Sequence, residues 1–163
     1  MFWKKKEPEI VKSIAWFSYS IMLPEKEEDE EDIMVVGNLN ISNIGTAALN
    51  NPLICLRTKP SENVRLGGKI GSVNHTALMI DGSNTEAWVY IDDDWKEKAL
   101  SSGEHWLKPS KSKALEQGTN LNFGYELQVS SKKKDRFVLV EGFFYCDEQK
   151  DGISALNSIS INF

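Results

Sequence analysis

The stretch Asn120-Leu121-Asn122-Phe123-Gly124-Tyr125-Glu126-Leu127-Gln128-Val129 alternates between apolar and polar side chains. Successive side chains of a β-strand point to opposite faces, so the pattern predicts a strand with one buried and one exposed face. Residues 137–146 are apolar at both parities, as expected of a central strand, and residues 159–163 alternate again. The second half of the chain therefore predicts β-structure.

The same period of two recurs towards the N-terminus. Within residues 10–23, Ile14 and Trp16 share one parity whereas Phe17, Tyr19 and Ile21 share the other, and we expect Trp16 and the later Trp88 to anchor the core. Further strands are predicted at 33–42, 52–59, 63–70, 76–80 and 86–91. The turn sequence Asp81-Gly82-Ser83-Asn84 makes the last two the clearest hairpin of the chain.

Helical signals are short and confined to one segment. Asp94-Trp95-Lys96-Glu97 has the spacing of a capping box, and Gly103 could end a helix over residues 95–101. Residues 112–117, closed by Gly118, could add one more turn. The chain is thus predicted to be all-β, an antiparallel β-sandwich of about eight to nine strands with one or two short helical turns in the 92–118 segment.

Length and charge limit the organisation of the chain. At 163 residues, residues 1–163 are expected to form a single β-sandwich domain with a long insertion at 92–118. The net charge of −5 is local, because residues 25–32 hold seven acids and one base. We interpret this run as an acidic loop between strands. The rest of the chain is about neutral, which argues against nucleic-acid binding.

The cysteines and the N-terminus bear on the compartment. Cys55 and Cys146 each lie in an apolar stretch, which favours buried, reduced thiols. Lys4-Lys5-Lys6 resembles the start of a signal peptide, but Glu7 and Pro8 interrupt it and no cleavage site follows. No run of 18 apolar residues predicts a membrane span. A cytoplasmic location is therefore expected.

Two short motifs resemble a known group of modules. Residues 39–52 read Leu-Asn-Ile-Ser-Asn-Ile-Gly-Thr-Ala-Ala-Leu-Asn-Asn-Pro, followed by an apolar strand, and residues 115–123 read Leu-Glu-Gln-Gly-Thr-Asn-Leu-Asn-Phe. Both are similar to motifs of bacterial immunoglobulin-like domains of the cell-adhesion-related CARDB type. The resemblance implies an immunoglobulin-like sandwich and a role in interaction, and it carries over no catalytic residue. The chain exceeds the usual module of about 100 residues.

Possible metal and catalytic groups are few. Asp92-Asp93-Asp94 suggests calcium, but Lys96 and Lys98 occupy positions that should ligate, so helix capping is favoured. The two histidines and two cysteines lack zinc-ligand spacing, and Gly67-Gly68-Lys69-Ile70-Gly71 fits a bent strand better than a phosphate loop. We expect no metal, no cofactor and no enzymatic activity.

The sequence leaves two functions open. The first is a non-catalytic interaction or structural module for an unidentified protein partner; the alternative is a carbohydrate-binding module that uses Trp95 and Trp106. Both place the candidate binding residues Trp95, Trp106 and Asp94 in the 92–118 segment. These tryptophans either hold the segment against the sandwich or present it to a ligand, and we expect one of them to hold it. The oligomeric state stays open.

Overall fold

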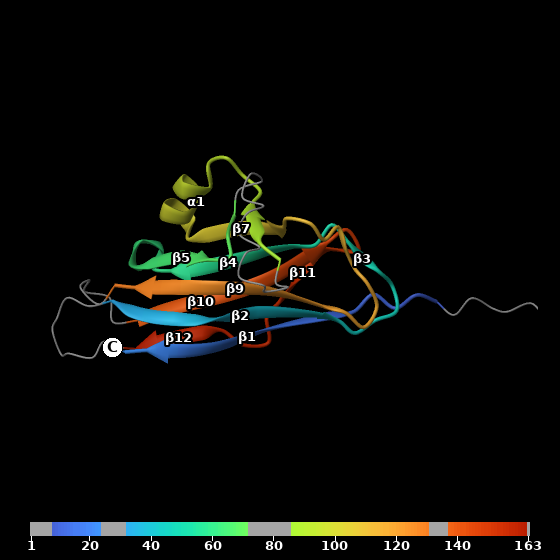
Figure 1. Cartoon of the computed structure of the whole chain (residues 1–163), viewed down its shortest axis with the longest axis horizontal. Helices are drawn as coiled ribbons and strands as arrows, with labels where there is room; N and C mark the ends of the chain where they lie inside the picture. The colour runs from blue at the N-terminus through green and yellow to red at the C-terminus, as the bar shows by residue number, and fades with distance from the viewer. Residues whose placement is uncertain (1–7, 24–31, 72–85, 131–136, 163) are drawn as a thin grey trace, which may run out of the picture.

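The structure is a computed structural model that describes residues 8–23, 32–71, 86–130 and 137–162. Two antiparallel sheets lie face to face (Figure 1). The elements in chain order are β1 (Ser13–Met22), β2 (Ile33–Asn43), β3 (Leu49–Asn50), β4 (Leu53–Lys59), a 3₁₀ turn η1 (Ser61–Asn63), β5 (Val64–Gly68), β6 (Trp88–Tyr90), α1 (Trp95–Ser102), β7 (Glu104–Pro109), β8 (Ala114–Leu115), β9 (Asn120–Val129), β10 (Phe137–Cys146), β11 (Gln149–Ser154) and β12 (Ile159–Asn162).

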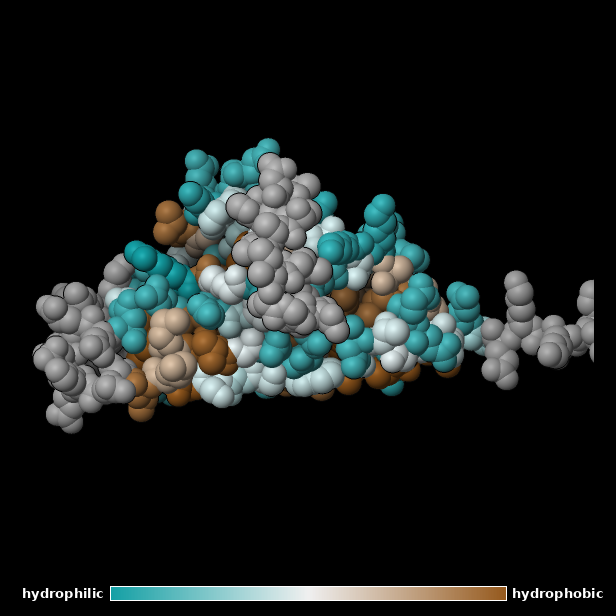
Figure 2. All heavy atoms as spheres, viewed as in Figure 1, coloured by the Kyte–Doolittle hydropathy of each residue, from teal (hydrophilic) through white to brown (hydrophobic). Residues whose placement is uncertain are grey.

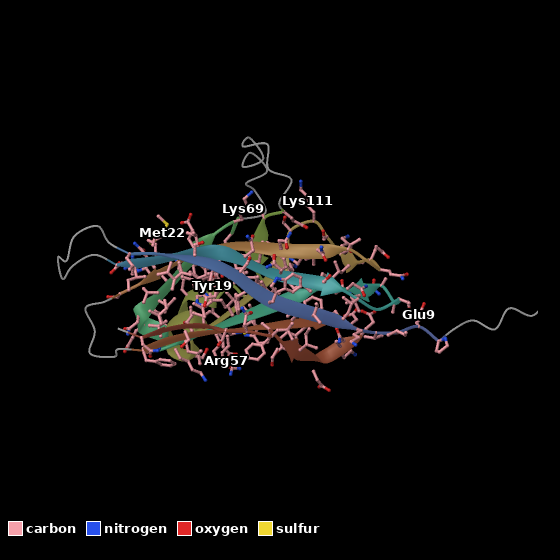
Figure 3. All side chains as sticks on the ribbon, turned by 90° about the horizontal axis from the view of Figure 1, so that it is seen from below. Glu9, Tyr19, Met22, Arg57, Lys69 and Lys111 are labelled. Carbon is pink, nitrogen blue, oxygen red and sulfur yellow. The ribbon has the colours of Figure 1, made fainter. Side chains whose placement is uncertain are left out.

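The first sheet has the strand order β1-β2-β9-β5, and the second has β11-β10-β4-β7-β6 with β12 also paired to β10. Two strands, β3 and β8, form a small ribbon of their own. The outer faces of the large sheets lie on opposite sides of the molecule, as Lys69 and Arg57 show in Figure 3. An all-β antiparallel sandwich, as predicted, is confirmed.

The strand order is that of an immunoglobulin-like domain with an added hairpin. The order β1-β2-β9-β5 corresponds to the A-B-E-D sheet of the immunoglobulin fold. In the second sheet, β4 takes the place of strand C, β10 that of strand F, and β11 with β12 that of strand G. β6 and β7 follow the D-like strand β5 along the chain but extend the opposite sheet beside β4. The hairpin thus brings the 92–118 segment to the edge of the second sheet.

The core fills the space between the sheets. β9 alternates as predicted, with Leu121, Phe123, Tyr125, Leu127 and Val129 buried. Trp88 of β6 is fully buried, its ring lies 5.6 Å from that of Phe123, and its Nε1–H donates to the carbonyl oxygen of Asn122 at 3.0 Å. This hydrogen bond satisfies the one polar group of the largest buried side chain.

Several expectations about the local elements are corrected. Twelve strands are found in the described residues, more than the expected eight to nine, because β3 and β8 have two residues each and β6 has three. Residues 112–117 do not form a helical turn, since Ala114 and Leu115 pair with β3. Residues 92–118, expected to contain short helical turns, include the strands β7 and β8 as well as α1.

The helix and its first residue were predicted correctly, but its capping interaction was not. α1 spans Trp95–Ser102, and Gly103 ends it in the left-handed conformation. Asp94 is the N-cap residue, yet its side chain makes no capping hydrogen bond, so the capping box is wrong. No helix within the described ranges is long and apolar enough to cross a membrane. The predicted strand 76–80 and its turn, and all but the last residue of the acidic run 25–32, lie outside the described residues.

Trp16 is the main correction to the predicted core. It lies on the outer face of the first sheet and is partly exposed, whereas Ala15 and Phe17 point into the core. Both parities of β1 carry apolar side chains, so alternation alone does not select the buried face. The cysteine prediction is confirmed, since Cys55 and Cys146 are both free and buried.

Candidate binding site

A hollow of about 670 Å³ lies where β5 of the first sheet approaches β6 and the start of α1. It is lined by the residues that follow: Leu66, Gly67, Gly68, Ile70, Gly71, Val89, Tyr90, Ile91, Asp92, Asp93, Trp95 and Lys108. We call it the β5–β6 groove. Its floor is apolar and its rim carries charges, the composition usual for a site that binds and orients a ligand.

Trp95 and Tyr90 form the aromatic wall of the groove. Their rings stack in parallel, with centroids 4.1 Å apart and an interplanar angle of 8°. The Tyr90 hydroxyl shares a hydrogen bond of 2.8 Å with Nδ1 of His105, which is buried behind it. Burial raises the pKa of Tyr90 and lowers the pKa of His105 to about 4, so both are neutral at neutral pH. The wall is thus fixed to the core by an uncharged pair.

The rim of the groove carries charged side chains, and only some of them form ion pairs. Nζ of Lys98 on α1 lies 2.9 Å from Oδ2 of Asp92, and this hydrogen bond raises the pKa of Lys98. The Asp93 and Lys108 side chains are exposed and make no hydrogen bond or ion pair within the described part of the chain. A carboxylate and an ammonium group are therefore available to a ligand at the groove.

One side of the groove is an open strand edge. β5 pairs with β9 on one side only, and no strand in the described ranges pairs with its other side. Lys69 donates its N–H to the carbonyl of Gly124, and Asn63 accepts from Ser130, so the odd-numbered residues of β5 bond to β9. The N–H and C=O of Leu66 consequently point away from β9, towards the groove.

The structure separates the residues that the sequence placed together. Trp95 lines the groove, and Asp94 is exposed just beside it at the start of α1. On β7, Leu107 pairs with Tyr90, so these two side chains share one face of the second sheet. Trp106 is the neighbour of Leu107 along the strand and therefore points to the opposite face. There its ring packs 5.1 Å from that of Tyr145. Trp95 and Trp106 therefore do not form one platform.

Neither face of Trp95 is free for a sugar ring. One face is stacked on Tyr90, and Nζ of Lys96 lies over the indole, 5.5 Å from its centroid. A sugar ring binds an aromatic side chain by lying flat on an open face. The arrangement favours Trp95 as the side chain that holds α1 against the sheet.

The other chemical groups give no catalytic or metal arrangement in the described residues. Burial raises the pKa of Cys55 to about 12, which disfavours a thiolate nucleophile. No three His, Cys, Asp or Glu side chains gather to hold a metal ion within residues 8–23, 32–71, 86–130 and 137–162. Of the groove residues, only Trp95 was a binding candidate from the sequence; the glycines of 67–71, interpreted there as a bent strand, also line the groove, and nothing in the sequence indicated the part played by Tyr90.

Comparisons with known proteins give no family. No family model matches the chain, and no curated protein matches it. Solved structures are similar in fold, among them the following three, each at 11% sequence identity. A FixG-related protein from Vibrio parahaemolyticus has a TM-score of 0.33, with 91% of this chain and 94% of that chain covered. The collagen-binding domain of a Staphylococcus aureus adhesin scores 0.41, with 91% and 97% covered. The collagen-binding subdomain of the Enterococcus faecalis surface protein ACE scores 0.36, with 98% and 100% covered. At these scores the similarities do not indicate what this chain binds.

Proposed function

We propose that this chain is a non-catalytic binding module that holds an extended segment of a partner protein in the β5–β6 groove. The observation that carries the proposal is the open edge of β5 beside a hollow of about 670 Å³. An extended segment can add to such an edge as a further strand. Its main-chain hydrogen bonds then supply affinity, and its alternate side chains enter neighbouring pockets.

The groove also suggests which segment would fit. The outward N–H and C=O of Leu66 would pair with the segment backbone, and one apolar side chain would contact Ile70, Val89 and the Tyr90 ring. The unpaired carboxylate of Asp93 lies on the same rim and would attract a Lys or Arg side chain. We therefore expect the bound segment to alternate apolar residues with at least one basic residue.

The chemistry around the groove supports binding rather than catalysis. His105 lies behind Tyr90, buried and hydrogen-bonded to it, and neither His105 nor a cysteine lines the groove. The carbohydrate alternative on Trp95 and Trp106 receives no support from their placement on opposite faces. A partner protein is thus the ligand that the groove fits best.

A peptide-display selection tests this function. The full chain is immobilised and used to select from a library of random 12-residue peptides. We expect selected peptides to have alternating apolar residues and a Lys or Arg, and to lose at least tenfold in affinity for Ile91→Glu, which places a charge in the groove. The matched control Ile44→Glu changes an apolar residue of similar exposure, 46% against 41% for Ile91, that does not line the groove, and it should leave binding intact. Failure to enrich any peptide, or equal loss in both variants, would overturn the proposal.

A further inference from the structure

The outer face of the first sheet carries a block of nine neighbouring residues without a charge. The block comprises three rows in register across β1, β2 and β9, namely Ile14-Ser42-Asn120, Trp16-Asn40-Asn122 and Ser18-Asn38-Gly124. We call it the amide face. It lies on the side of the molecule seen in Figure 2, where hydrophilic and near-neutral residues form a band across the lower middle of the view.

The absence of charge sets this face apart from an ordinary surface. A surface designed for solubility carries about 25–35% charged residues, which would place about two or three in a block of nine. Here the polar groups are four asparagines and two serines. Side-chain amides and hydroxyls both donate and accept hydrogen bonds, which suits a ligand that is itself covered with hydroxyl groups.

Part of the amide face is already ordered by its own hydrogen bonds. Nδ2 of Asn40 donates to Oγ of Ser18 at 3.1 Å and to the carbonyl of Trp16 at 3.3 Å. The Ser42 hydroxyl donates to Oδ1 of Asn120 at 2.5 Å. These bonds fix the outer rows in place, so a ligand would meet a largely preformed surface.

Other groups on the face are left for a ligand. The side chains of Asn38 and Asn122 have no hydrogen-bond partner among the described residues. The Trp16 indole is partly exposed and makes no hydrogen bond, ring contact or cation contact there, in contrast to Trp95. A partly exposed indole on the edge strand β1 thus shares this face with two unpaired amides, those of Asn38 on β2 and Asn122 on β9.

We propose that the amide face binds an uncharged glycan, with a sugar ring on the Trp16 indole and sugar hydroxyls on Asn38 and Asn122. The apolar C–H face of a pyranose ring packs on an indole, while its equatorial hydroxyls reach amides at the sides. Strands about 4.8 Å apart and residues about 3.4 Å apart along each strand give a platform of about 10 by 14 Å, the size of a short oligosaccharide. The block itself has no cation to pair with a uronate, sialate or sulfate group, and the Lys69 side chain lies at its border, beside Gly124.

This site is separate from the β5–β6 groove, because its rows lie on the sheet face whereas the groove follows the open edge of β5. It also differs from the carbohydrate site that the sequence predicted. That site used Trp95 and Trp106, and Trp16 was expected to lie in the core. The tryptophan that is free to bind a sugar is Trp16, not Trp95 or Trp106.

The test is a printed array of defined oligosaccharides of glucose, galactose, mannose, xylose and N-acetylglucosamine, with sialylated and sulfated glycans beside them. We expect the full chain to bind at least one neutral glycan and to bind the anionic glycans more weakly. The strongest neutral glycan is then titrated by calorimetry. No neutral glycan bound, or preferential binding of anionic glycans, overturns the proposal.

Variants assign the binding to this face. Trp16→Ala and Asn122→Ala should each weaken glycan binding at least tenfold, while Trp106→Ala, on the outer face of the other sheet, should retain it. Asn122→Ala removes an exposed side chain without a partner, so it remains informative should Trp16→Ala fail to fold. Ile91→Glu should leave glycan binding unchanged, which distinguishes this site from the groove. Undiminished binding by Asn122→Ala, or loss in Trp106→Ala, contradicts the assignment.

Discussion

The indole of Trp95 lies parallel to the phenol ring of Tyr90, with 4.1 Å between the ring centroids. Trp95 is the first residue of α1, and Tyr90 is the last residue of β6, so this contact ties the helix to the edge of the second sheet. Tyr90 in turn contacts the buried His105. This contact therefore links the start of the helix to the core, while the Ser61 hydroxyl donates to the Leu100 carbonyl oxygen nearer its other end.

Replacing Trp95 by alanine should destabilise the protein. Aromatic pairs contribute about 0.5–1.5 kcal/mol beyond their buried area, and Trp95 is only partly buried, so we expect a loss of about 2 kcal/mol in the free energy of unfolding. Trp95→Phe, which keeps an aromatic ring on Tyr90, should lose less than half of this. Urea unfolding measures both, and an unchanged midpoint for Trp95→Ala would show that the side chain does not hold the helix.

Two glycines with nearly equal φ angles offer a matched test of packing at the end of α1. Gly103 has φ of 71° and Gly118 has φ of 72°, but an added Cβ would lie 2.1 Å from the Thr58 carbonyl oxygen at Gly103 and would meet nothing within 4 Å at Gly118. Gly118→Ala should cost about 1–2 kcal/mol, the cost of the left-handed conformation alone. Gly103→Ala should cost at least twice as much in the same unfolding experiment. Equal costs would contradict the close approach of α1 to β4.

Stability should fall in mild acid because of His105. Its pKa is lowered to about 4 by burial, from an ordinary value of about 6.5. The unfolded chain therefore binds more protons between these two values, and the stabilising contribution, full above pH 6.5, is lost as the pH falls towards 4. The shift corresponds to at most about 3 kcal/mol. His105→Gln should flatten this part of the pH profile of the unfolding free energy, whereas an unchanged slope would show that His105 titrates normally.

Both cysteines should react slowly with a thiol reagent in the native protein. Cys55 is 1% exposed and Cys146 is 4% exposed, and burial raises the pKa of both thiols. We expect labelling at neutral pH to be at least a hundredfold slower than in urea. Rapid labelling of native Cys55 would restore it as a candidate nucleophile.

The alternation of side chains was sufficient to predict most of the fold. β9 has polar and apolar residues in strict turn, and its buried face follows directly from the sequence. β1 has apolar residues at both parities, so the choice of Phe17 over Trp16 for the core depends on how the second sheet packs against it. Local sequence does not contain that information.

The candidate sites depended on contacts between distant segments. Trp95 was identified as a binding candidate, but its partner Tyr90 lies on a strand whose position beside β7 comes from sheet order. The groove exists because β5 and β6 belong to different sheets, although they follow each other among the described elements. Neither the sheet order nor the separation of Trp95 from Trp106 follows from residue spacing.

Amide hydrogen exchange along β5 tests the proposed function most directly. Arg65 and Gly67 direct their N–H groups to β9, whereas Leu66 directs its N–H to the open edge. In the free protein the Leu66 amide should therefore exchange much faster than its two neighbours. Addition of a saturating selected peptide should slow the Leu66 amide at least tenfold. A Leu66 amide that is already protected in the free protein, or that exchanges equally fast with the peptide bound, would contradict strand addition at β5.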